Sequence, residues 1–322
     1  MLPFWSPLLD ANINPDSRAR YKQAVTKFLA FVEQADGQSL DSAASLDYWL
    51  AYFAHDARTN GTNSRSTVEK ALFGCEHWLP EAGRLPLARR CLRGWQKLQP
   101  PRPYAPMPRD LALAAAAMAA LEGNIGVAIA ILLGFDAWLR ISEVAALTAA
   151  DVFDTTSARD LVARGVSVFL AQCKTGRRQA VRLEDAATAR LVVAWAVAAR
   201  RQGGNTTRLF GSPALLRDTL SRCLRALDDG SMDLHGLCFV WHSLRHGGAS
   251  RAYLAGMPLA DVLTRGRWKA ERSGRHYIQA GRQLLLTQRL PVAASALAKR
   301  LMATDLLAIV ATDVRATLRA MA

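Results

Sequence analysis

The stretch HSLRHGGASRAYLAGMPLADVLTRGRWKAERSGRHYI (242–278) is the most informative part of this 322-residue chain. It holds an imidazole at His242, a guanidinium at Arg245, an indole donor at Trp268 and a phenol at Tyr277. A phenol has a pKa of about 10, so at neutral pH it is a weak nucleophile unless its proton is removed or its oxyanion is stabilised. An imidazole can take that proton, and an arginine stays charged and binds phosphate oxygens bidentately. The stretch therefore predicts attack on a phosphodiester by a tyrosine.

Two further cations lie upstream of this stretch. GFDAWLRISEVAAL (134–147) ends a buried helix at Arg140, with Glu143 three residues later. VSVFLAQCKTGRRQAVRL (166–183) has alternating apolar residues on each side of K-T-G-R-R, which predicts a β-hairpin with Lys174 at its turn. A second arginine would complete an oxyanion clamp, and a lysine can protonate a leaving 5′ oxygen. This chemistry needs no carboxylate cluster for Mg²⁺, and we expect no metal and no cofactor.

The order and spacing of these residues resemble the tyrosine recombinase (phage integrase) family. Its first motif, roughly G-L-R-x-x-E-L, matches Arg140 and Glu143, and its second, H-x-x-R, matches the HSLR that begins at residue 242. The family also has a His or Trp nine residues before its nucleophile, and Trp268 lies nine residues before Tyr277. G-R-W (266–268) stands where L-G-H is usual. The motifs cover about residues 134–278 and are most similar to Cre-like or DIRS-like mobile-element recombinases.

The resemblance implies a site-specific DNA recombinase that forms a 3′-phosphotyrosyl link through Tyr277 and releases a 5′ hydroxyl. Two arginines would hold the phosphate, while a histidine and a tryptophan support it and Lys174 protonates the leaving oxygen. Glu143 would position Arg140 or His242. His246 would support the catalytic residues without contacting the phosphate. The catalytic residues implied in this way are Arg140, Lys174, His242, Arg245, Trp268 and Tyr277.

Each residue alone has an ordinary explanation, and two rival functions remain. Trp268 and Tyr277 could be core residues, Arg140 could form a structural salt bridge with Glu143, and Lys174 could be a solvated turn residue. The combination of six matches in order favours the active-site interpretation. The rivals are a type IB topoisomerase, which uses a similar set of residues, and a catalytically silent DNA-binding protein of the same fold.

Charge and composition agree with a nucleic-acid partner. The chain carries a formal net charge of +14, with a pI near 10.2 and 51% hydrophobic residues. Most of the positive excess lies after residue 110. Such a balance indicates a polyanion partner. The five cysteines are scattered and odd in number, which is typical of reduced thiols inside a cell.

The sequence predicts no signal peptide and no membrane span. The N-terminus lacks a basic segment, and the longest apolar run, 126–139, is shorter than the ~20 residues that a span needs. We therefore expect an intracellular protein located with DNA, in a bacterial cytoplasm or a nucleus, and no membrane partner.

The helical and turn patterns predict a mainly α protein with a small β-sheet, in two domains. A helical DNA-binding (core-binding) domain is expected at 1–98, with its first helix capped by Asp16 or Ser17, followed by a proline-rich linker at 99–109. An α+β catalytic domain follows at 110–290, with one helix near 272–281. The Gly247-Gly248 pair indicates close backbone packing, near the DNA. The tail at 291–322 has apolar residues at helical spacing and could dock on its own domain or on a neighbouring protomer.

The expected partner is a double-stranded DNA recombination site, bound by a homo-oligomer, expected to be a tetramer on two sites. Basic residues of the helical domain and of the hairpin are candidates for phosphate contacts, because such contacts dominate DNA affinity. An ordinary solvated role is equally open for those of the helical domain. These candidates are Arg18, Lys22, Arg65, Lys70, Arg177 and Arg178.

Overall fold

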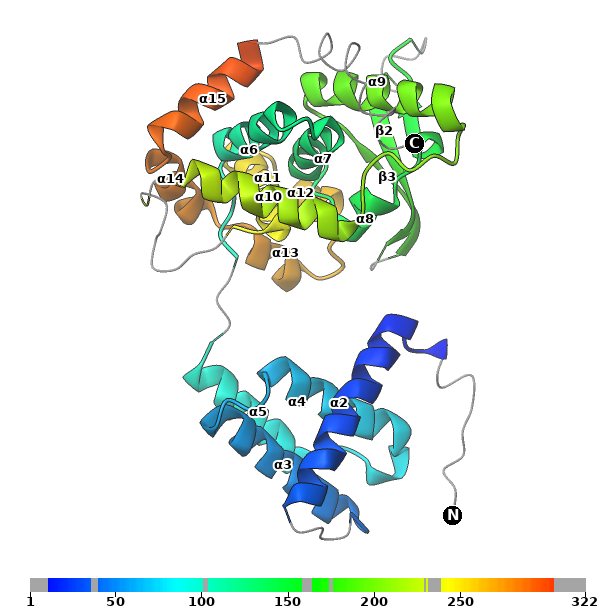
Figure 1. Cartoon of the computed structure of the whole chain (residues 1–322), viewed down its shortest axis with the longest axis vertical. Helices are drawn as coiled ribbons and strands as arrows, with labels where there is room; N and C mark the ends of the chain where they lie inside the picture. Colours follow the sequence, from blue (N-terminus) through cyan, green and yellow to red (C-terminus); the bar gives the residue numbers. More distant parts are fainter. Residues whose placement is uncertain are drawn as a thin grey trace. The chain divides into compact units, whose positions relative to one another are not determined.

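A computed structural model describes residues 11–35, 40–100, 104–157, 164–173, 176–228, 230 and 239–303. The chain divides into two compact units, Met1–Arg102 and Pro103–Ala322 (Figure 1). None of the described helices combines the length with the run of apolar residues that a bilayer crossing requires.

The first unit is built from helices, as the sequence predicted. Its core gathers Phe28, Leu50, Phe53 and Leu72, all essentially inaccessible to solvent. The side chain that caps the first helix is Asn14, which accepts from the backbone N–H of Asp16, so the predicted cap at Asp16 or Ser17 was wrong. The elements are α2 (Pro15–Gln34), α3 (Ala43–Thr59), α4 (Arg65–Trp78), the 3₁₀ turn η1 (Pro80–Ala82) and α5 (Pro86–Leu98).

A buried carboxylate joins two of these helices. Asp47 of α3 accepts from the backbone N–H groups of Leu87 and Ala88, at 2.9 and 2.8 Å, in the first turn of α5. Helix α5 has no capping side chain of its own. Asp47 therefore satisfies donors that a helix start leaves unpaired, and its charge is favourable there.

The second unit is mainly helical with a three-stranded antiparallel sheet, as the sequence predicted. Its helices are α6 (Arg109–Leu121), α7 (Ile125–Asp136), α8 (Ile141–Ala146), α9 (Ala186–Gly203), α10 (Pro213–Leu227), α11 (Trp241–Leu254), α12 (Leu259–Arg265), α13 (Glu271–Tyr277), α14 (Ala280–Gln288) and α15 (Val292–Ala303), with the 3₁₀ turn η2 (Ala149–Asp151). Helix α7 is apolar on every side and lies in the middle of this unit, between α6, α9, α10 and α11 (Figure 1).

The sheet has the order β1 (Val152–Asp154), β2 (Val166–Cys173) and β3 (Gly176–Arg182). The predicted hairpin is confirmed: Cys173 pairs with Gly176, so only two residues separate the strands. Those two residues include Lys174, which lies outside the described part of the chain. Strand β1 was not predicted, because it has three residues and only Val152 is buried.

The C-terminal half of the expected linker is packed onto the second unit. Ala105 and Met107 are fully buried, and the backbone N–H of Met107 donates to the carbonyl of Ser243 at 2.9 Å. A Cβ at Gly247 would lie 2.0 Å from the Met107 carbonyl oxygen, and one at Gly248 would lie 2.2 Å from that of Phe135. The predicted close backbone packing of this pair is confirmed, and its partner is the protein's own backbone.

The chain after residue 271 differs from the single helix predicted at 272–281. Helix α13 ends at Tyr277, and α14 begins at Ala280 after two residues with non-helical backbone. Helix α15 packs against α6 of the same chain and buries Ala294 and Ala298. The rest of the predicted apolar repeat, 304–322, lies outside the described residues.

Candidate active site

A phenol and an imidazole meet where α13 ends and α11 begins. The hydroxyl oxygen of Tyr277 lies 2.9 Å from Nε2 of His242, within hydrogen-bond range. Helix α11 starts here because the Ser243 hydroxyl accepts from the backbone N–H of Val240 at 3.1 Å, which satisfies a donor at the helix start. His242 is therefore fixed in the first turn of α11 with its ring toward Tyr277.

Arg245 lies three residues beyond His242 and is fully buried. Its two terminal nitrogens donate to the carbonyls of Trp138 and Gly266. The centre of its guanidinium is 4.8 Å from the ring of Trp268 and 5.4 Å from the ring of Tyr277. Burial, and then repulsion from neighbouring arginines, lowers the pKa of Arg245. An anion beside Tyr277 would relieve that cost.

Arg140 is held by the carboxylate that follows it in the first turn of α8. Its Nη1 donates to Oε1 of Glu143 at 2.6 Å, and its backbone N–H donates to Oε2 at 2.9 Å. The side chain of Glu143 is only 3% exposed, whereas that of Arg140 is 18% exposed. Of the two partners that the sequence suggested for Glu143, the structure therefore favours Arg140.

Trp268 covers another side of the phenol. Its ring centroid lies 4.7 Å from that of Tyr277, and its ring also stacks on Trp138 at 6.1 Å. The indole N–H is buried and has no hydrogen-bond partner among the described residues. An indole nitrogen is a donor only, so this group is suited to an incoming oxygen atom.

His246 packs against the ring of Tyr277. Its ring stacks on Tyr277 with centroids 4.5 Å apart and planes 19° apart, and only 1% of the residue is exposed. Burial, helped by His242, lowers the pKa of His246 to about 3. His246 therefore stays neutral at working pH and packs Tyr277 in place.

The structure thus brings together five of the six residues predicted to be catalytic, with Lys174 outside its described part. The other predicted contacts lie elsewhere: Arg178 is exposed on β3, and the side chain of Arg177 is not among those described. In the first unit, Arg18 and Lys22 line one hollow on α2 together with Trp78, and Arg65 forms an ion pair with Glu69 at 3.5 Å. Lys70 is half-buried on α4.

Two residues at the site were not predicted. The ring of Tyr104, from the expected linker, packs edge-on against His242 at 5.7 Å, and its carbonyl accepts from Gln279. Nothing in the proline-rich stretch indicated this contact. Arg267 donates to Glu143 at 2.8 Å. The unusual arginine in G-R-W was the available signal, although the predicted site includes only the tryptophan of that motif.

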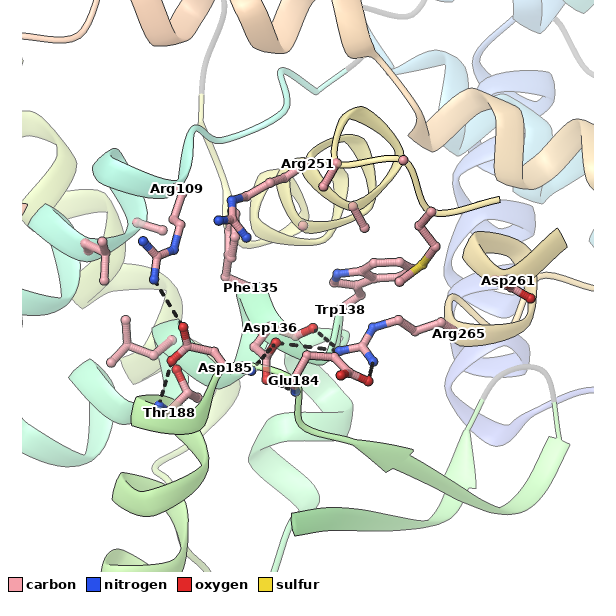
Figure 2. A pocket seen from close by; sticks show the side chains of 18 of the residues that line it. Arg109, Phe135, Asp136, Trp138, Glu184, Asp185, Thr188, Arg251, Asp261 and Arg265 are labelled. Atoms are coloured by element: carbon pink, nitrogen blue, oxygen red, sulfur yellow. Dashed lines mark hydrogen bonds and ion pairs between the residues drawn. The ribbon is translucent and has the colours of Figure 1, made fainter. Parts of the chain in front are cut away.

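A cavity of about 570 Å³ borders this site at Trp138 (Figure 2). Arg265 crosses it to reach the Asp136 backbone carbonyl and the Glu184 carboxylate, both at 2.8 Å, and lies over the Trp138 ring. Burial raises the pKa of Asp136 to about 6, although Arg265 opposes the shift. Neither Tyr277 nor His242 lines this cavity.

Within the described ranges no group of three or more His, Cys, Asp or Glu side chains is placed to hold a metal ion.

The fold is similar to those of solved integrases and recombinases. The Tn1549 transposon integrase in complex with transposon right end DNA gives a TM-score of 0.58 at 12% identity, covering 86% of this chain and 95% of that one. A lambda integrase tetramer bound to a Holliday junction gives 0.57 at 13%, covering 83% and 73%. The XerH site-specific recombinase bound to difH substrate, in a pre-cleavage complex, gives 0.50 at 15%, covering 85% and 78%.

No protein-family model and no curated protein matches the sequence. At these identities the structural likeness establishes the fold. The chain has the tyrosine recombinase fold, as the resemblance of its motifs predicted.

Proposed function

We propose that this protein is a site-specific DNA recombinase that cuts and rejoins strands through a 3′-phosphotyrosyl intermediate at Tyr277. The observation that carries the proposal is the 2.9 Å contact between the Tyr277 hydroxyl and His242, beside two buried or half-buried arginines. His242 takes the phenol proton as the oxygen attacks phosphorus. The strong positive charge of the chain suits a DNA partner.

The remaining groups stabilise the charge that grows on the phosphate. Arg140 and Arg245 bind the non-bridging oxygens, and the indole N–H of Trp268 donates to the same phosphate. Lys174 protonates the leaving 5′ oxygen. The phosphotyrosyl bond keeps the energy of the original linkage, so rejoining by the 5′ hydroxyl needs neither ATP nor a metal ion.

Recombination of two duplexes requires several copies of the chain. We propose a tetramer on two DNA sites, active inside the cell in integration, excision or transposition. A lambda integrase tetramer on a Holliday junction has the same fold. The helical first unit and the hairpin of the second supply the phosphate contacts proposed for Arg18, Lys22, Arg65, Lys70, Arg177 and Arg178.

Trapping the intermediate tests this function. Wild-type protein and Tyr277→Phe are incubated with a pool of nicked suicide duplexes that have randomised centres, and adducts that resist denaturation are collected. We expect an adduct from the wild type only, and sequencing of the trapped DNA gives the site. Tight binding with no adduct from either protein would favour a silent DNA-binding protein. Relaxation of supercoils without a preferred site or partner duplex would favour a type IB topoisomerase.

A further inference from the structure

Arg267 is a third arginine in the active site, in an unusual backbone conformation. Its φ is +56°, in the left-handed region that favours glycine, yet it carries a long side chain that is only 6% exposed. Non-glycine residues in this region are costly and gather at functional sites. The turn G-R-W thus sends a guanidinium inward where a glycine would satisfy the backbone more easily.

Two acceptors that Arg267 contacts also accept hydrogen bonds from the other arginines. Its Nη2 donates to Oε2 of Glu143 at 2.8 Å, the oxygen that also accepts the backbone N–H of Arg140. The same Nη2 lies 3.5 Å from the carbonyl oxygen of Trp138, which accepts from Arg245. Arg267 therefore contacts a group on each side of the predicted phosphate clamp.

The negative charge of Glu143 stabilises this third arginine, and the net positive charge that remains would favour binding of a phosphate. The buried carboxylate of Glu143 forms ion pairs with Arg140 and Arg267, and its charge also acts on the buried guanidinium of Arg245. A buried carboxylate with two ion-pair partners keeps one orientation, because turning toward either partner loses the other. The excess positive charge suits a phosphodiester, whose negative charge grows as the reaction proceeds.

We propose that Arg267 is a positioning residue, which fixes the Glu143 carboxylate and thereby sets the Arg140 guanidinium group for the phosphate. This inference rests on the proposed recombinase function. Arg267 does not itself bind the phosphate in this scheme. Its effect on the reaction passes through Glu143.

Arg267→Gly is the most direct variant, because glycine accepts the left-handed backbone and Glu143 keeps Arg140 as a partner. We expect single-turnover cleavage of the recovered suicide duplex, at saturating protein, to slow by about 100-fold, the effect of a small misplacement of catalytic groups. The dissociation constant for DNA and the melting temperature should stay close to wild type. Arg267→Lys, which retains a cation within reach of Glu143, should recover part of the rate.

Arg222→Ala is the matched control. It removes another arginine that is paired with a glutamate, at 2.7 Å, on the exposed surface of α10. We expect no change in its cleavage rate. A wild-type rate for Arg267→Gly, or an equal loss in Arg222→Ala, would overturn the positioning role.

A double-mutant cycle with Glu143→Gln tests the route of the effect. If Arg267 acts through Glu143, the double variant should cleave no more slowly than Glu143→Gln alone. Multiplying effects would instead mean that Arg267 acts by a route other than Glu143 and would overturn the inference. Should Glu143→Gln fail to fold, Glu143→Asp takes its place.

If the wild type itself forms no adduct, the proposed function fails and this inference fails with it. If the wild type forms a normal adduct, the rates of the variants test the role of Arg267 alone.

Discussion

The hydroxyl of Tyr277 lies 2.9 Å from Nε2 of His242, so the last residue of α13 is joined to the first turn of α11. The pair is enclosed by Trp268 on one side and by His246 on another. Because a phenol at neutral pH must lose a proton to react, this contact places His242 where the proposed recombinase would need a general base.

Replacing His242 by alanine should therefore slow cleavage by about 10²–10⁴-fold, the usual contribution of a general base. Binding of DNA should be little changed, since the charge of the site comes from its arginines. The measurement is the rate of adduct formation in a single turnover, with DNA affinity measured in parallel. A variant that cleaves as fast as wild type would remove His242 from the chemistry.

Lys174 gives a prediction that depends on the leaving group. Lys174→Ala should slow cleavage of normal DNA, and a substrate with a 5′-bridging sulfur should restore the rate, because a thiolate leaves without a proton. Lys299→Ala, an exposed lysine on α15, is the control and should behave as wild type on both substrates. Equal slowing of Lys174→Ala on both substrates would argue against a general acid.

His246 predicts a dependence of stability on pH. Its pKa is about 3 in the folded protein and about 6.5 when unfolded, so its stabilising contribution is complete above pH 6.5 and is lost on acidification. Between pH 7 and pH 4 the unfolding free energy of wild type should fall by about 3 kcal/mol relative to His246→Gln, measured by urea denaturation. Asp136, whose raised pKa acts in the opposite direction, is present in both proteins and cancels. A constant difference across this range would show that His246 protonates normally in the fold.

Two truncations separate the roles of the C-terminal helix and of the residues beyond it. Deleting 292–322 removes the helix that buries Ala294 and Ala298 against α6, and it should cost about 3 kcal/mol of stability. Deleting only 304–322 leaves that helix in place. We expect this shorter deletion to keep the melting temperature and DNA binding and to reduce assembly on DNA, measured by analytical ultracentrifugation. Full assembly without 304–322 would exclude docking of that segment on a neighbour.

Local patterns were sufficient for most of the fold and for bringing five of the six candidate residues to one place. The hairpin around Lys174 follows from alternation, and α7 follows from a long apolar run, because both signals are local. The contacts of Tyr104 and Arg267 were not predictable in this way, since each depends on how distant segments pack. Strand β1 was missed because a strand of three residues contains too little alternation to be recognised. The break after Tyr277 was missed because Ile278 and Gln279, where the helix is interrupted, are neither glycine nor proline.

Trp138 contributes to the site through its backbone as well as through its ring. Its φ of +52° turns the chain after α7, and its carbonyl accepts a hydrogen bond from Arg245 and lies within reach of Arg267. Alanine scanning removes side chains and leaves carbonyls in place. Such a scan would therefore record only the packing of the indole ring and would overlook the oxygen atom that holds the arginines. Replacing the amide that follows Trp138 by an ester, which weakens that acceptor without changing any side chain, is the substitution that would reveal it.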